Sequence, residues 1–233
     1  MQEQYIRTEM LIGKDAVARL RDARVAVFGV GGVGGYAVEA LARAGVGAIV
    51  LIDSDRVALS NINRQIIATH STVGMYKTEA ARARIAEIDP TLEVEIHNVF
   101  FDKENADDFD FSSYDYLIDA IDSLGSKIEL ISSAMAAGTR IISAMGAGNK
   151  LDPTRFEVSD ISKTEVCPLA RAVRVALRKR GINHLKVVYS KEKPYSVRED
   201  GGERVPASIS FVPSAMGLII AGEVIKDIAG IKV

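Results

Sequence analysis

Residues 24–52 read RVAVFGVGGVGGYAVEALARAGVGAIVLI, and they carry the clearest structural pattern in the chain. The apolar run at 24–28 predicts a strand, the glycine cluster at 29–35 a loop, residues 36–44 a helix, and residues 48–52 a second strand. A glycine loop between a strand and a helix lets backbone amides approach a phosphate, and the helix N-terminus adds partial positive charge. This stretch therefore predicts a β-loop-α-β unit that binds a nucleotide.

The alternation of strands and helices continues on both sides of a change at Pro153. Before it we expect a helix over 72–88, strands over 92–99 and 116–119, a helix over 125–137 and a strand over 140–144. After it we expect a strand over 156–161, a helix over 169–180, a strand over 185–188 and a helix over 214–228. Strands separated by helices favour parallel pairing.

We therefore predict an α/β fold, Rossmann-like and doubly wound, with a mainly parallel sheet extended by a mixed C-terminal part. The chain is expected to form a single domain over 1–233, with a nucleotide-binding half over 1–150 and a substrate-facing half over 151–233. The segment 190–206 is rich in charge, Gly and Pro and is predicted to be a loop.

Composition excludes several classes of protein. The 233 residues are 48% hydrophobic and 26% charged, and 29 basic side chains against 31 acidic ones give a net charge of −2. Disordered, collagen-like and globally basic nucleic-acid coat proteins are excluded by these values. The sequence shows no export signal and no apolar run long enough to span a bilayer, so we expect a cytoplasmic protein without integral membrane association, with peripheral membrane contact left open.

The single cysteine, Cys167, limits the chemistry further. It cannot form an intrachain disulfide, and it cannot build a zinc site from spaced cysteine pairs, so we expect no zinc. We interpret Cys167 as structural rather than catalytic. A reducing compartment is the consistent setting.

The glycine cluster leaves the kind of nucleotide open. Gly29, Gly31 and Gly34 satisfy the spacing Gly-x-Gly-x-x-Gly, and Asp53 stands at the tip of the next strand, where a carboxylate can accept hydrogen bonds from ribose hydroxyls. On their own these residues also fit an NAD-dependent oxidoreductase, or a structural turn that binds nothing.

Charged residues further along the chain favour a triphosphate. A triphosphate carries more negative charge than a dinucleotide, and attack on it needs fixed cations and magnesium, which a carboxylate can hold. Each candidate taken singly is a common surface residue, but all are expected at the carboxyl ends of strands, where open sheets bind ligands. The candidates are Asn61, Arg64, Lys77 and Asp122.

These residues in this order resemble the superfamily of ubiquitin-activating-like adenylating enzymes, over almost the whole chain. The resemblance implies an ATP site in which Asp53 binds ribose, Asp122 coordinates magnesium, and the glycine loop lines the nucleotide through Gly29, Gly31, Gly32 and Gly34. It implies that the phosphates are held and polarised by Asn61, Arg64 and Lys77. It also implies a homodimer that delivers Arg7 across its interface as a further catalytic residue beside Arg64, Lys77 and Asp122, although Thr8 stands where the family has Gln.

The second half resembles one branch of that superfamily, the tRNA threonylcarbamoyladenosine dehydratases. The matching motifs are Asp160 to Thr164 (DISKT), Cys167 to Arg171 (CPLAR) and Phe211 to Gly217 (FVPSAMG). The resemblance implies ATP-dependent cyclisation of N6-threonylcarbamoyladenosine in tRNA through an acyl adenylate, with release of AMP and pyrophosphate. It leaves open a monovalent cation near the site and a sulfur-transfer partner protein.

A basic helix gives this tRNA expectation an electrostatic counterpart. No Asp or Glu occurs between Cys167 and Lys191, and Arg171, Arg174 and Arg178 fall on one helical stripe. Such a stripe suits phosphate contacts, so these arginines are the predicted tRNA-binding residues. A solvated helix face, a membrane contact or a protein partner are the other interpretations of a basic amphipathic helix.

Two other functions remain open at this point. An activator of a small sulfur-carrier protein ending in Gly-Gly would show ATP–pyrophosphate exchange only with that protein present. An NAD-dependent oxidoreductase would bind NAD and not ATP, and Arg64, Lys77 and Asp122 argue against it. A tRNA-binding module without catalysis would not need these residues.

Overall fold

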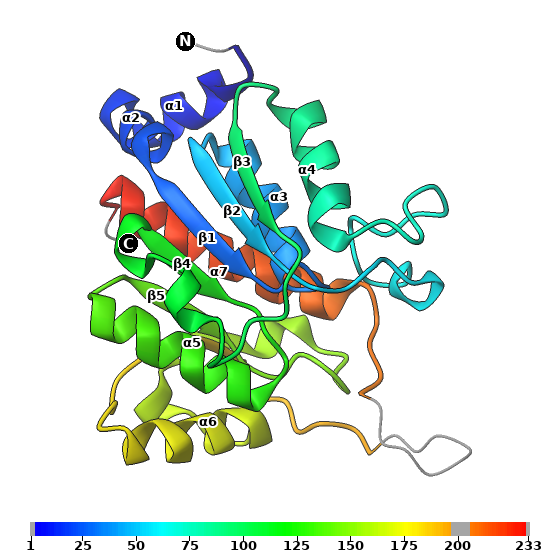
Figure 1. Cartoon of the computed structure of the whole chain (residues 1–233), viewed down its shortest axis with the longest axis vertical. Helices are drawn as coiled ribbons and strands as arrows, with labels where there is room; N and C mark the ends of the chain where they lie inside the picture. Colours follow the sequence, from blue (N-terminus) through cyan, green and yellow to red (C-terminus); the bar gives the residue numbers. More distant parts are fainter. Residues whose placement is uncertain (1–2, 197–205, 232–233) are drawn as a thin grey trace.

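The computed structural model describes residues 3–196 and 206–231, and it is built around one seven-stranded sheet (Figure 1). The strand order is β3-β2-β1-β4-β5-β7-β6, and only the edge pair β6–β7 is antiparallel. Both predicted halves of the chain contribute strands to it. The strands are β1 (Arg24–Phe28), β2 (Ala48–Ile52), β3 (Glu93–His97), β4 (Tyr116–Asp119), β5 (Ile141–Ala144), β6 (Phe156–Asp160) and β7 (Lys186–Ser190).

The apolar side chains of the strands alternate between the two faces of the sheet. Helices therefore cover both faces and form two cores. One core joins Val25 and Val27 of β1 to α3, α4 and α7, and the other joins Ala26 and Phe28 to α5 and α6. The predicted doubly wound α/β fold with a mixed C-terminal part is thus confirmed. The helices are α1 (Ile6–Ile12), α2 (Lys14–Asp22), α3 (Gly34–Ala44), α4 (Lys77–Ile88), α5 (Leu124–Ala137), α6 (Pro168–Lys179) and α7 (Phe211–Ala229).

The largest departure from the predicted elements lies before α4. The helix expected from residue 72 begins only at Lys77, because the backbone of the preceding residues pairs with residues 55–57 instead. Val57 donates to the carbonyl of Met75, and Gly74 adopts a left-handed φ of 91° that a helix does not allow. The segment from Asp55 to Lys77 therefore folds back on itself and returns to the end of β2.

Two further regions bear on the sequence expectations. Helices α1 and α2 precede β1 and were not predicted, although Ala16, Val17 and Leu20 of α2 have helical spacing and are buried. Of the loop predicted over 190–206, residues 197–205 lie outside the described residues. Within the described part of the chain, no helix combines the length and apolar character needed to cross a membrane.

The carboxyl ends of the parallel strands meet along one edge of the sheet, and the loops that leave this edge carry the candidate site. The strand order reverses around β1, with β2 on one side and β4 on the other. Open α/β sheets bind ligands at such a reversal point.

Candidate functional site

The glycine loop follows β1 and lies tightly against β4. Gly29 has a φ of 89°, and a Cβ atom there would lie 2.6 Å from the carbonyl oxygen of Ala120. A Cβ atom at Gly34, the first residue of α3, would lie 1.8 Å from the carbonyl oxygen of Gly29. Positions 29 and 34 therefore accept only glycine. Gly31 and Gly32 are half-buried at the tip of the loop, with bare backbone toward the sheet edge.

Asp53, directly after β2, connects this loop to the folded-back segment. Its carboxylate accepts hydrogen bonds from the backbone N–H groups of Val30 at 2.7 Å and Asp55 at 2.8 Å. Burial raises the pKa of Asp53 above its ordinary value, and the ammonium of Lys77, 3.8 Å from Oδ1, acts in the opposite direction. The carboxylate is therefore held in place beside the glycine loop by both neighbours.

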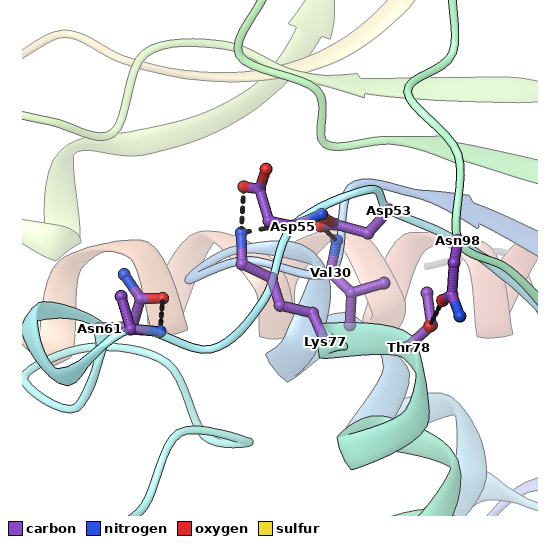
Figure 2. A network of polar contacts seen from close by, with 8 residues as sticks. Val30, Asp53, Asp55, Asn61, Lys77, Thr78 and Asn98 are labelled. Carbon is purple, nitrogen blue, oxygen red and sulfur yellow. Dashed lines mark hydrogen bonds and ion pairs between the residues drawn. The ribbon is translucent and has the colours of Figure 1, made fainter. Parts of the chain in front are cut away.

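Lys77 is the first residue of α4, and its side chain is buried between two carboxylates. Its Nζ atom lies 2.6 Å from Oδ2 of the exposed Asp55, and Figure 2 shows the group formed by Val30, Asp53, Asp55 and Lys77. Both residues were predicted to lie at the carboxyl ends of strands, and this contact between Asp53 and Lys77 joins residues that are far apart in sequence. The fold-back of the intervening segment produces it.

Asn61 and Arg64 lie on that same folded-back segment. Oδ1 of Asn61 accepts a hydrogen bond from the N–H of Ala58 at 3.0 Å, so this side chain shapes the loop, apart from the Lys77 group in Figure 2. Nη1 of Arg64 donates to the carbonyl of Ser60 at 3.0 Å, and its Cγ atom is 3.5 Å from the position of a Cβ atom on Gly32. Arg64 therefore lies against the tip of the glycine loop.

Asp122 reaches the same sheet edge from the other side, in the loop between β4 and α5. Its side chain is exposed. The turn before it is fixed by Asp119, the last residue of β4, which accepts a hydrogen bond from the N–H of Ile121 at 3.1 Å. The buried carboxylate of Asp119 thus fixes the turn that carries the exposed carboxylate of Asp122.

Lys127 is part of this support and was missed by the sequence reasoning. Its fully buried ammonium lies 2.7 Å from the fully buried carboxylate of Asp119 and donates to the carbonyl of Ala144 at 3.0 Å. Ser143 donates to the same carboxylate. A lysine on the buried stripe of α5, one turn before Leu130 and Ile131, is the signal that would have found it.

Gln65 is the second missed residue. Its Oε1 atom is buried and has no hydrogen-bond partner among the described residues, and its Nε2 atom lies 3.8 Å from the position of a Cβ atom on Gly31. A buried polar atom without a partner is unusual in a folded protein. The sequence signal was its position directly after Arg64.

Arg7 is not brought to this edge within one chain. It is exposed on α1, and α1 is anchored through the preceding Tyr5, whose hydroxyl donates to Asp89 at 2.8 Å and lies 3.1 Å from the carbonyl oxygen of Ala42. Both partners lie at the C-terminal ends of helices that begin at the site, so α1 occupies the opposite edge of the sheet.

The predicted basic stripe on α6 divides into two kinds of arginine. Arg171 and Arg178 are exposed. The guanidinium of Arg174 is half-buried and donates to the carbonyl of Thr164 at 2.8 Å and to its hydroxyl at 2.6 Å, which holds the loop before α6. Cys167, at the start of the helix, is 3% exposed and packs in the second core.

The assembled edge offers backbone amides, two cations and the exposed carboxylates of Asp55 and Asp122, which is a set suited to a nucleoside triphosphate. Within residues 3–196 and 206–231 there is no group of three or more His, Cys, Asp or Glu side chains placed to hold a metal ion by themselves.

Known proteins resemble this chain along most of its length. The chain is 44% identical over 242 residues to the tRNA threonylcarbamoyladenosine dehydratase of Bacillus subtilis (strain 168), covering 98% of this chain and 95% of that protein. It is 41% identical over 171 residues to the enzyme of the same name from Escherichia coli (strain K12), covering 73% of this chain and 64% of that protein. The crystal structure of E. coli tRNA N6-threonylcarbamoyladenosine dehydratase in complex with ATP superposes with a TM-score of 0.90 at 33% identity, covering 98% of this chain and 95% of that one. The model of the ThiF family matches residues 5–233, and the chain therefore belongs to the ThiF family.

Proposed function

We propose that this chain catalyses the ATP-dependent dehydration of N6-threonylcarbamoyladenosine in tRNA. The observation that carries the proposal is the match, along nearly the whole chain, to a relative named for this reaction. The phosphate-binding geometry at the sheet edge supports it independently, because an enzyme that activates a carboxylate needs ATP at such a site. The tRNA substrate also argues for a cytoplasmic protein.

In this proposal ATP lies over the glycine loop. Ribose hydroxyls donate to the carboxylate of Asp53, whose position beside Val30 suits this role. The phosphates lie against the backbone of Gly31 and Gly32 and are held by Arg64 and Lys77, while Asn61 shapes the segment that carries Arg64. Lys77 is already held between carboxylates, so its charge needs little rearrangement when the reaction occurs.

Two steps follow from this placement. The carboxylate of the threonyl side chain attacks the α-phosphorus of ATP, an acyl adenylate forms, and pyrophosphate leaves. The carbamoyl group of the same side chain then attacks the activated carbonyl, loses a proton and expels AMP, so that a ring closes and one water is lost overall. Because both reacting groups belong to one side chain, the second step is intramolecular and needs no covalent enzyme intermediate.

Magnesium is consistent with the donor set at this edge. The exposed carboxylate of Asp122 is a single oxygen ligand of the type magnesium prefers, and magnesium is usually bound by one or two carboxylates together with substrate phosphates. Asp122 would hold the ion, which would neutralise charge on the phosphates.

We also propose that the active form is a homodimer in which Arg7 reaches the partner's site. Arg7 lies at the opposite edge from its own glycine loop, and its helix exposes Met10 and Leu11 at 82% and 85%. Exposed apolar side chains on one short helix suit a protein interface.

Mixing two inactive variants tests the shared site. If Arg7 acts across the interface, a dimer of one Arg7→Ala chain and one Lys77→Ala chain keeps one intact site. Random reassociation of equal amounts then recovers about one quarter of wild-type turnover. Turnover that stays at the level of the separate variants would show that Arg7 serves its own chain or no site.

The reaction itself is tested by mass spectrometry of nucleosides from tRNA that bears threonylcarbamoyladenosine, incubated with the protein, ATP and magnesium. The expected result is the loss of one water from that nucleoside, dependent on ATP and abolished by Asp122→Ala. An unchanged nucleoside together with ATP–pyrophosphate exchange induced by a small protein ending in Gly-Gly would instead identify a carrier-protein activator.

A further inference from the structure

A groove lies between α5 and α6, outside the nucleotide site. Its volume is about 930 Å³, and the two helices lie side by side on one face of the sheet (Figure 1). Its apolar lining includes Leu124 and Ile128 of α5 and Val175 of α6. Leu124 is 41% exposed and Val175 is 49% exposed, so this apolar surface is open to a ligand.

The charges around the groove are nearly all positive. Four basic side chains line it, Arg171, Arg174, Lys179 and Arg180, against one carboxylate, Glu165. A concave surface lined by one sign of charge concentrates ions of the opposite sign. The groove is therefore suited to an anionic ligand with an apolar part.

The four cations differ in how they are already bonded. Arg180 lies 2.9 Å from Glu129 and from the hydroxyl of Ser132, both on α5. Arg174 is bonded to the loop before α6.

Arg171 and Lys179 are exposed, and within the described part of the chain their side chains have no hydrogen bond or ion pair. They are separated by about 12 Å along α6, at 1.5 Å per residue. Two charges at this distance can contact different phosphates of one strand.

The groove opens at the same sheet edge as the candidate ATP site. Leu124 and Gly125, which line it, follow Asp122 in the same loop and first turn. At the start of α6, Sγ of Cys167 lies 3.6 Å from the position of a Cβ atom on Gly146, which follows β5 at this edge. A polymer bound in the groove thus has one end beside the residues proposed to hold ATP.

We propose that this groove binds the single-stranded RNA that flanks the modified adenosine, with phosphates at Arg171 and Lys179 and a base over Leu124 and Val175. This inference rests on the proposed function. Single-stranded loops are the parts of RNA whose bases are available to a protein surface, and backbone contacts by basic side chains fix them without reading sequence. Of the predicted arginines, Arg171 is then a direct contact, Arg174 a support of the neighbouring loop, and Arg178 a surface charge outside the groove.

Three single variants separate these roles. Arg171→Ala and Lys179→Ala each remove a groove charge, and Arg178→Ala is the matched control, since it removes an exposed charge from the same helix outside the groove lining. The dissociation constant for modified tRNA is measured by fluorescence anisotropy between 50 and 200 mM salt. ATP affinity of the same variants is measured by calorimetry.

Each groove variant is expected to weaken tRNA binding by about 5- to 10-fold and to lower the salt slope by about one, with ATP affinity unchanged. Arg178→Ala is expected to weaken it by less than about 2-fold, because only long-range attraction is lost. Equal effects of all three variants would overturn the groove as the binding site. If Arg171→Ala and Lys179→Ala weakened binding to phosphatidylserine vesicles but left tRNA binding unchanged, the groove would be a membrane contact. That result would also overturn the inference.

A photo-crosslinking amino acid at Val175 gives an independent readout. Cross-links are expected at nucleotides adjacent to the modified adenosine, whereas the same group at Val158, an exposed position on the edge strand β6, is expected to give none there. Cross-links from Val175 only to other parts of the tRNA would overturn the inference.

The wild-type protein separates this inference from the proposed function. Failure of the wild type both to bind the tRNA and to remove water from its nucleoside would contradict the proposed function. In the other case the wild type binds the tRNA and removes water from its nucleoside, while Arg171→Ala and Lys179→Ala keep the tRNA affinity of Arg178→Ala. That combination would contradict RNA binding in the groove and leave the proposed function intact.

Discussion

The two ends of the carboxyl edge hold their charges in opposite ways. At the nucleotide end, Lys77 is buried and bonded to Asp53 and Asp55 before any ligand arrives. At the α5–α6 groove, Arg171 and Lys179 are exposed and, within the described residues, carry no ion pair. The nucleotide end is held by the ion pairs of a buried lysine, and the groove has two exposed cations without such pairs among the described residues.

This difference fits the two ligands proposed for them. The charge that develops when a triphosphate reacts arises at one position, and groups held there in advance stabilise it. An RNA strand is flexible, and attraction to its phosphates tolerates small changes of position. We therefore expect nucleotide-end variants to change the rate and groove variants to change the affinity.

The largest effect is expected at Lys127, which lies between the two ends under the turn of Asp122. Lys127→Met leaves the carboxylate of Asp119 buried without its cation, and breaking such a pair typically costs about 3–5 kcal/mol of unfolding free energy. Denaturant unfolding measures this loss. The double variant Asp119→Asn/Lys127→Met is the control and is expected to lose less than the single variant; strictly additive losses would show that the pair is not coupled.

Lys77→Ala is the next largest change and tests the nucleotide end alone. Loss of a preorganised charge should lower kcat by about 100- to 1,000-fold. The affinity for tRNA should stay unchanged, because the groove is untouched. Lys103→Ala, which removes an exposed lysine that is not among the site residues, is the control, and a parallel loss of tRNA affinity in Lys77→Ala would remove the distinction between the two ends.

Arg174→Ala sharpens the comparison within the basic helix. It removes the hydrogen bonds to Thr164, at a cost of about 1–3 kcal/mol, or several degrees in Tm. Its tRNA affinity should fall less than that of Arg171→Ala. A variant that keeps its Tm but loses as much affinity as Arg171→Ala would make Arg174 a phosphate contact.

The smallest effect is expected at Glu39, on α3, away from both ends. Burial alone would raise its pKa, but hydrogen bonds from Arg84 and Arg43 hold the pKa of Glu39 below its ordinary value. Its stabilisation is therefore present above the unfolded-state pKa of about 4.3 and is lost as the pH falls through the folded-state value.

Glu39→Gln should cost about 1–2 kcal/mol at pH 7 and flatten the loss of stability between about pH 5 and 3. Thermal unfolding as a function of pH measures both. Glu87→Gln, at an exposed position on α4, is the control, and an unchanged acid limb in Glu39→Gln would assign acid unfolding to other carboxylates.

Much of the fold followed from local pattern. The strands β1, β2 and β4 were predicted with their observed bounds. Each is a short apolar run between glycine and charged residues, so the pattern leaves little choice of where the strand begins and ends. The start of α4 was missed, because backbone pairing between residues 55–57 and 74–77 outweighs the helical pattern there.

The sequence by itself determined the glycine loop, the position of Asp53 and the charges that follow, because each depends on neighbours in the chain. Only the tertiary structure decided which cations are available: it buried Lys127 against Asp119, tied Arg174 to Thr164 and carried Arg7 to the far edge. The physical reason is that a side chain's exposure and partners depend on segments that are distant in sequence and meet only when the sheet is assembled.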